Sequence, residues 1–132
     1  MSLLYLAGPI ADCEDDECVS WRKDILEVYP DSANPMIRDY RDNHHDNINE
    51  IVVLDKRDID NSEIVLVRFT RISAGTMMEI IYAWSKGKPI IFWHDPDYPY
   101  EKLSPWIKYH CTTFVTSFDE ACEKIDYYAG RD

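Results

Sequence analysis

Short runs of apolar residues alternate along this chain with stretches in which apolar residues recur every three or four positions. The longest run occupies residues 63–69, where Ile, Val, Leu and Val follow one another. Shorter runs of the same kind occupy residues 3–7, 89–93 and 113–115. Runs of this length, bounded by Gly, Pro or Asn, predict buried β-strands. A short extended piece before Asn34-Pro35 predicts one further strand.

The stretches between these runs have the periodicity of amphipathic helices. Gly87 lies where it would end one of them, and Ser117 with Glu120 forms a capping box that opens the last. The predicted helices span residues 18–29, 48–59, 76–86, 106–110 and 117–129.

Strands and helices therefore alternate over the whole chain. This pattern predicts a parallel sheet with right-handed crossovers and helices on both faces. We expect an α/β, flavodoxin-like (Rossmann-like) three-layer sandwich with about five strands. Residues 1–132 read as a single domain, because no repeat or linker interrupts the pattern.

Composition and charge narrow the classes of function. The chain is 45% hydrophobic, which predicts a packed core, and its net charge of -11 argues against binding a nucleic-acid polymer. A small nucleoside or nucleotide remains compatible with that charge. No apolar run approaches the roughly 20 residues that span a bilayer, and no basic-then-apolar leader opens the sequence. We therefore expect no membrane association and a cytoplasmic location.

The four cysteines do not form a recognisable metal or redox motif. None belongs to a CxxC pair, and free thiols in a reducing compartment are the simplest interpretation. Cys13, Cys18, His44 and His45 could in principle hold zinc, but their spacing fits no standard pattern. The spacing therefore does not predict a metal site.

Glu79 lies just after the central apolar run, beyond a turn of small residues that begins at Ser73. In an open α/β sheet, ligands bind at the carboxyl ends of the strands, so a carboxylate there is well placed for chemistry. An oriented, ionised carboxylate can attack a sugar carbon and form a covalent intermediate. A structural interpretation competes with this one, because residues 76–79 also read as a capping box in which Glu79 bonds the backbone of Thr76.

Asp55, Asp58 and Tyr5 are the candidate partners of Glu79. The two aspartates are three positions apart on a predicted helix, so they lie near one face. They could form a solvated helix end, or one of them could point toward Glu79 and act as the acid or base that exchanges a proton with the leaving group. Tyr5 could be a core aromatic, or its phenol could bond Glu79 if the first and third strands are neighbours.

An ordered set of motifs resembles the nucleoside 2-deoxyribosyltransferase family over about residues 3–125. Each motif is short, but together they follow one another in the family's order. They are Tyr5-Leu6-Ala7-Gly8-Pro9, Trp21-Arg22, Asn34-Pro35-Met36, Asp58-Ile59, Ser73-Ala74-Gly75-Thr76-Met77-Met78-Glu79 and Gly87-Lys88-Pro89.

The resemblance implies a flavodoxin-like fold and cleavage of the bond between a nucleobase and 2-deoxyribose, followed by transfer to another base. It implies that Glu79 is the nucleophile, that Asp58 assists the departing base, and that Tyr5 orients Glu79. The sequence does not decide between Asp55 and Asp58, and the motif favours Asp58. The resemblance further implies no metal or organic cofactor, and homo-oligomers with shared active sites. The substrate-binding residues implied are Gly8, Pro9, Ser73, Gly75 and Ser104.

The substrate stays open between a free nucleoside and its 5'-monophosphate. Family members acting on nucleosides carry an acidic residue near Ser73, whereas a serine resembles the branch that hydrolyses deoxynucleoside 5'-monophosphates, as does the segment around Ser104. The first loop argues the other way, because residues 12–17 are acidic and would repel a phosphate unless an arginine such as Arg22, Arg38 or Arg71 compensates. A non-catalytic nucleotide-binding module is the alternative from another class.

Overall fold

The computed structural model describes residues 1–42 and 44–131, apart from the side chains of His44 and His45, so the zinc alternative involving these two histidines lies outside the described residues. The strands are β1 Ser2–Ala7, β2 Ser32–Ala33, β3 Ser62–Phe69, β4 Ile90–His94 and β5 Thr113–Val115. The helices are α1 Asp15–Cys18, α2 Ser20–Val28, α3 Ile48–Asp60, α4 Ala74–Ser85, α5 Pro105–His110 and α6 Phe118–Ala129. Short 3-10 helices are η1 Pro35–Ile37, η2 His44–Asn47 and η3 Tyr100–Lys102.

The five strands form one sheet in the order β2-β1-β3-β4-β5, and every neighbouring pair is parallel. This is the flavodoxin-like order, so the predicted fold class is confirmed. In the register of the two central strands, Tyr5 lies beside Val65 and Ala7 beside Val67. The first and third strands are therefore neighbours, which is the condition under which Tyr5 could reach Glu79.

The side chains of β1 contribute to two separate hydrophobic cores, one on each face of the sheet. Leu4 and Leu6 pack with α2 and α6, in a cluster that includes Ile25 and Ile125. Tyr5 belongs to the opposite cluster, with side chains of α3, α4 and α5. Because successive side chains of a strand point to opposite faces, Tyr5 points away from its neighbours Leu4 and Leu6, toward the face covered by α4.

Two helix boundaries differ from the sequence prediction. The helix expected at residues 18–29 is divided into α1 and α2, with Val19 between them. Helix α4 begins at Ala74 with Ser73 as its N-cap, two residues before the expected start. Glu79 is therefore in the second turn of α4 rather than at the third position of a capping box.

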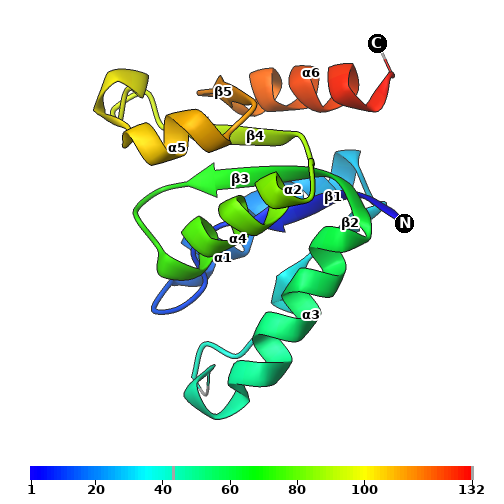
Figure 1. Ribbon diagram of the computed structural model, residues 1–132, viewed down its shortest axis with the longest axis vertical. Helices are drawn as coiled ribbons and strands as arrows, with labels where there is room; N and C mark the ends of the chain where they lie inside the picture. The colour runs from blue at the N-terminus through cyan, green and yellow to red at the C-terminus, as the bar shows by residue number, and fades with distance from the viewer. Residues whose placement is uncertain (43, 132) are drawn as a thin grey trace.

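Helix α3 extends away from the rest of the molecule, as Figure 1 shows, with its N-terminal end farthest from the sheet. Its C-terminal end leads into β3, where Ile59 is buried against the core. Only one of its 13 residues is buried. Most of α3 therefore lies outside the core of the protein.

Candidate active site

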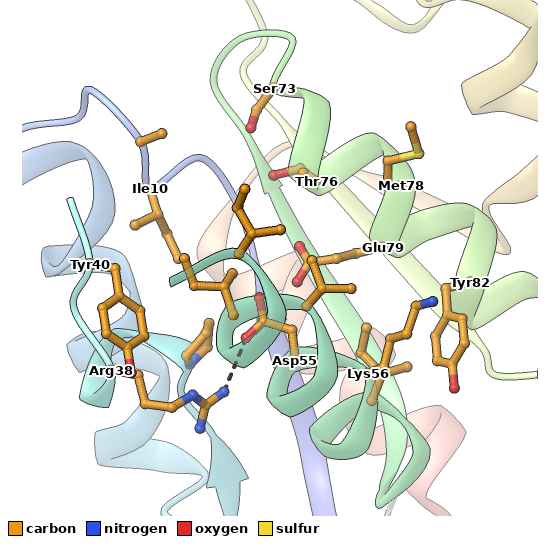
Figure 2. Close-up of a pocket in the computed structure, with 18 of the residues that line it drawn as sticks. Ile10, Arg38, Tyr40, Asp55, Lys56, Ser73, Thr76, Met78, Glu79 and Tyr82 are labelled. Atoms are coloured by element: carbon orange, nitrogen blue, oxygen red, sulfur yellow. Dashed lines mark hydrogen bonds and ion pairs between the residues drawn. The ribbon is translucent and has the colours of Figure 1, made fainter. Parts of the chain in front are cut away.

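A cavity of about 400 Å³ lies between α3, α4 and the loop that follows β1 (Figure 2). This volume is in the range of small-molecule sites. The cavity lies on the face of the sheet toward which Tyr5 points. Its lining residues are Gly8, Ile10, Ala11, Pro35, Arg38, Tyr40, Arg41, Ile48, Ile51, Val52, Asp55, Lys56, Ile59, Ser73, Gly75, Thr76, Met78, Glu79 and Tyr82.

Glu79 and Tyr5 form a hydrogen bond from a helix to the strand beneath it. The phenol of Tyr5, which is fully buried, donates to Oε2 of Glu79. No capping role competes for this carboxylate, because Ser73 rather than Thr76 is the N-cap of α4. The capping-box interpretation of residues 76–79 is therefore wrong, and the carboxylate of Glu79 is directed toward β1 and the cavity.

The environment of Glu79 favours its protonated form. Burial, and then the charge of Asp55, raise the pKa of Glu79 from 4.5 to about 8. The hydrogen bond from Tyr5 and the charge of Arg22 act in the opposite direction, because both stabilise the ionised carboxylate. The pKa of Tyr5 is raised well above 10, chiefly by burial and then by Glu79. Tyr5 therefore keeps its phenolic proton at any ordinary pH and acts as a hydrogen-bond donor to Glu79.

Asp55 lines the cavity from α3, and Figure 2 shows its carboxyl group directed toward Arg38. Its Oδ1 accepts a hydrogen bond from Arg38 at 3.0 Å. Burial raises the pKa of Asp55, while the hydrogen bond and charge of Arg38 oppose that increase. Asp55 and Glu79 are thus two carboxyl groups with raised pKa values that interact across one cavity.

Asp58 does not appear among the cavity-lining residues of the described chain. Its Oδ2 accepts from Arg38 at 2.8 Å, and its Oδ1 accepts from Arg57 at 3.1 Å. The reason is the helical periodicity of α3. A step of three residues falls about 60° short of a full turn, so the two side chains leave the helix in different directions. Asp55 therefore lines the cavity and Asp58 does not, although Arg38 contacts both.

Gly8 and Arg22 fix the loop at the floor of the cavity. A Cβ atom on Gly8 would lie 3.0 Å from the Trp21 ring and 3.1 Å from the backbone oxygen of Arg68, so only glycine fits without movement. Arg22 is fully buried and donates to the backbone oxygens of Leu6, Gly8 and Cys18. Pro9 is buried next to Gly8 but is not among the lining residues of the described chain.

The start of α4 presents polar groups to the other end of the cavity. Ser73 and Gly75 both line it, and the Ser73 side chain makes no capping hydrogen bond. The hydroxyl of Thr76 is buried and has no hydrogen-bond partner among the described residues. Free backbone N–H groups and the helix dipole make such an end favourable for an anion or an oxygen-rich group.

Two of the five acidic residues in the first loop pair with arginines. Glu17 pairs with Arg71 at 3.2 Å, and Asp15 pairs with Arg41 at 2.8 Å. These contacts reduce the repulsion that the loop would exert on a phosphate. Arg41 also lines the cavity. The sequence did not indicate this role, because Arg41 belongs to none of the motifs.

Ser104 lies apart from the cavity of its own chain. It is the exposed N-cap of α5, and its hydroxyl accepts from the backbone nitrogen of Trp106 at 3.2 Å. A role in substrate binding would therefore require a second copy of the chain, and it stays a prediction. Within the described residues, no group of His, Cys, Asp and Glu side chains could hold a metal ion, and no helix is long and apolar enough to cross a membrane.

The fold and the cavity define a parallel α/β protein with an interacting pair of carboxyl groups beside its sheet. A family model described as nucleoside 2-deoxyribosyltransferase matches residues 4–122, and the chain belongs to that family. Membership supports nucleoside deoxyribosyltransferase-type activity on small nucleoside and nucleobase substrates. A search of curated proteins found no match.

Proposed function

We propose that this protein cleaves the N-glycosidic bond of 2'-deoxyribonucleosides or their 5'-monophosphates through a covalent deoxyribosyl-Glu79 intermediate, and transfers the deoxyribose to another nucleobase. The observation that carries the proposal is the hydrogen bond from buried Tyr5 to Glu79, in a cavity that also contains Asp55. Two carboxyl groups beside one bond are the usual equipment for cleaving a glycosidic linkage.

In the first step, a carboxylate oxygen of Glu79 attacks the anomeric carbon of the sugar. The bond between this carbon and the base nitrogen breaks, and its electron pair goes to the base. Asp55 gives a proton to the base, so that the base leaves as a neutral molecule. Tyr5 holds Glu79 in the orientation for attack, because its phenol donates to Oε2.

In the second step, a second base attacks the anomeric carbon from the opposite face. The bond from this carbon to Glu79 breaks, and the carboxylate returns to its hydrogen bond with Tyr5. The incoming base loses its proton to Asp55, which restores the starting state. Two displacements at one carbon give overall retention of configuration.

The chemistry needs one proton on the pair formed by Glu79 and Asp55. Because burial raises both pKa values, and the charge of Asp55 helps to raise that of Glu79 to about 8, the pair still holds a proton near neutral pH. The reactive arrangement has this proton on Asp55, with the ionised form of Glu79 stabilised by Tyr5 and Arg22. The two groups titrate as a unit, so the activity reports the pair rather than either residue.

We assign the proton transfer to Asp55 rather than to Asp58, which the motif favours. Asp55 lines the cavity, and its charge acts directly on Glu79. Both oxygens of Asp58 are occupied by Arg38 and Arg57. An engaged carboxylate outside the cavity is a poor proton donor to a leaving group.

Hydrolysis of deoxynucleoside 5'-monophosphates is a second candidate, favoured by the start of α4. Ser73 is the N-cap of α4, but its side chain makes no capping hydrogen bond. The hydroxyl of Thr76, three residues further on, has no hydrogen-bond partner among the described residues. A hydroxyl and free N–H groups suit a phosphate better than a carboxylate would. We expect Ser73→Asp to weaken the use of monophosphates at least about tenfold relative to free nucleosides, through charge repulsion.

Chromatography of the free base released from deoxynucleosides and from their 5'-monophosphates, with and without a second base, tests the proposal. Base exchange on free nucleosides supports the transferase, and release from monophosphates without an acceptor supports the hydrolase. Binding of a nucleotide with no base released over a long incubation would indicate a non-catalytic module. The matched control is Glu79→Gln, which keeps the shape of the site but cannot act as the nucleophile.

A further inference from the structure

Arg38 joins the two aspartates of α3 through a single nitrogen. Its Nη2 donates to Asp55 Oδ1 at 3.0 Å and to Asp58 Oδ2 at 2.8 Å. The side chains of Arg38, Asp55 and Asp58 are 14%, 21% and 16% exposed, so the contacts are shielded from solvent. The reaction proposed above uses Asp55 but assigns no task to the other two residues.

We propose that Arg38 is a positioning residue for Asp55, and that Asp58 holds Arg38 in place for this task. The inference rests on the proposed function, in which Asp55 exchanges a proton with the base. It goes further by stating how the chain selects the oxygen of Asp55 that carries this proton.

The contact at Oδ1 determines the geometry of Asp55. A positively charged donor on Oδ1 disfavours a proton on the same oxygen, because two donors would then compete for it. The proton is therefore left on Oδ2. The same contact limits rotation of the carboxyl group, so that Oδ2 is held in one orientation as the proton donor.

Arg38 is itself held from two sides. It follows η1, where the Asn34 side chain accepts from the backbone nitrogen of Met36 at 3.0 Å and fixes the turn. Asp58 holds the guanidinium end, and Arg57 occupies the other oxygen of Asp58. Each oxygen of Asp58 thus accepts a hydrogen bond from an arginine, and Oδ2 is the one that holds Arg38.

The charges around Asp55 predict two effects of opposite sign. Arg38 and, from α2, Arg22 favour its ionised form, whereas burial and the charge of Asp58 favour its protonated form. Glu79 from α4 and Tyr5 from β1 also interact electrostatically with Asp55 across the cavity. Removing the charge of Arg38 should therefore raise the pKa of Asp55, and removing the charge of Asp58 should lower it.

The experiment compares Arg38→Gln, Asp58→Asn and the control Arg57→Gln in the full chain. Carboxyl ¹³C resonances of labelled aspartate follow the titration of Asp55. The rate of base release as a function of pH reports the titration of Glu79 and Asp55 during the reaction. We expect the Asp55 titration to move up by about one pH unit in Arg38→Gln. In Asp58→Asn the lost charge lowers the pKa of Asp55 while the release of Arg38 raises it, so this variant is judged by its fall in kcat. Arg57→Gln should leave the titration nearly unchanged, because Arg57 is exposed and the structure gives it no contact with Asp55.

The kinetic constants separate positioning from substrate binding. In Arg38→Gln we expect kcat to fall at least about tenfold, with KM within about twofold of the wild type. Arg38→Lys is the second variant, in case Arg38→Gln does not fold. It keeps a positive charge but not the planar fork, so kcat should fall while the titration stays near that of the wild type.

The proposal is overturned if Arg38→Gln leaves the titration of Asp55 unchanged, or if Asp58→Asn keeps the kcat of the wild type. It is also overturned if the whole loss in Arg38→Gln lies in KM. Failure of the proposed function looks different, because the wild type itself would then release no base from any deoxyribonucleoside. The ¹³C titration would still measure the effect of Arg38 on Asp55 in that case.

Discussion

Replacing Glu79 by glutamine should stabilise the fold while it removes the activity. The folded protein raises the pKa of this carboxyl group from 4.5 to about 8, chiefly through burial and the charge of Asp55. Glutamine is neutral at every pH, is close in shape, and keeps a carbonyl oxygen that can accept the hydrogen bond from Tyr5. The variant thus removes the cost of ionising a buried group and leaves most contacts in place.

The sign and size of the effect follow from proton linkage. The folded state binds the proton of Glu79 more tightly than the unfolded chain, so the wild type loses stability as the pH rises from 4.5 toward 8. Well below pH 4.5 the carboxyl group is protonated in both states and does not change the free energy of unfolding. Integration over the two pKa values gives a loss of about 1 kcal/mol at pH 5, about 3 kcal/mol at pH 7 and nearly 5 kcal/mol above pH 8.

Urea unfolding of the wild type and of Glu79→Gln at pH 5, 7 and 9 measures this loss directly. The advantage of the variant should grow from under about 1 kcal/mol at pH 5 to several kcal/mol at pH 9. Glu27→Gln, at an exposed position of α2, is the control and should show no such trend. Equal stability of the wild type and Glu79→Gln at all three pH values would refute the reasoning, as would a less stable variant.

Three further changes test other parts of the site. Asp55→Asn should lower base release by about 100-fold or more for ordinary bases, and much less for a substrate whose leaving group needs no proton, as measured by initial rates. Tyr5→Phe should lower kcat by about tenfold or more and move the pH dependence of Glu79 upward, because the lost hydrogen bond stabilises the ionised form; an unchanged pH profile would contradict this role. Gly8→Ala should lower the free energy of unfolding by about 1–3 kcal/mol, because its Cβ would meet the Trp21 ring at 3.0 Å, and an unaltered melting temperature would speak against that close approach.

The architecture follows from the sequence because strand and helix periodicities are local properties. The apolar run at residues 63–69 became β3, Ser62–Phe69, and the alternation along the chain gave the parallel sheet. The contact between Tyr5 and Glu79 could also be anticipated, since it needs only that the first and third strands are neighbours. Its physical basis is the alternation of side chains along β1.

The finer features of the site could not be read from the sequence. Asp55 and Asp58 are the same residue type and close in the chain, and only the rotation of α3 about its axis places Asp55 in the lining of the cavity and Asp58 outside it. Residues 76–79 matched a capping box, but the chain enters α4 at Ala74 instead. The pairing of the first loop's acidic residues with Arg41 depends on tertiary contacts, which leave no local signal.

The central claim is that Glu79 forms a covalent bond to the sugar, and the most direct test is to identify the labelled residue. The enzyme would be incubated with a 2-fluoro-arabinosyl nucleoside, whose electron-withdrawing fluorine slows breakdown of the intermediate, and then quenched and mapped by peptide mass spectrometry. The account predicts one pentosyl adduct per chain, on Glu79, and none in Glu79→Gln. Label on another residue, or steady base release by Glu79→Gln, would contradict it.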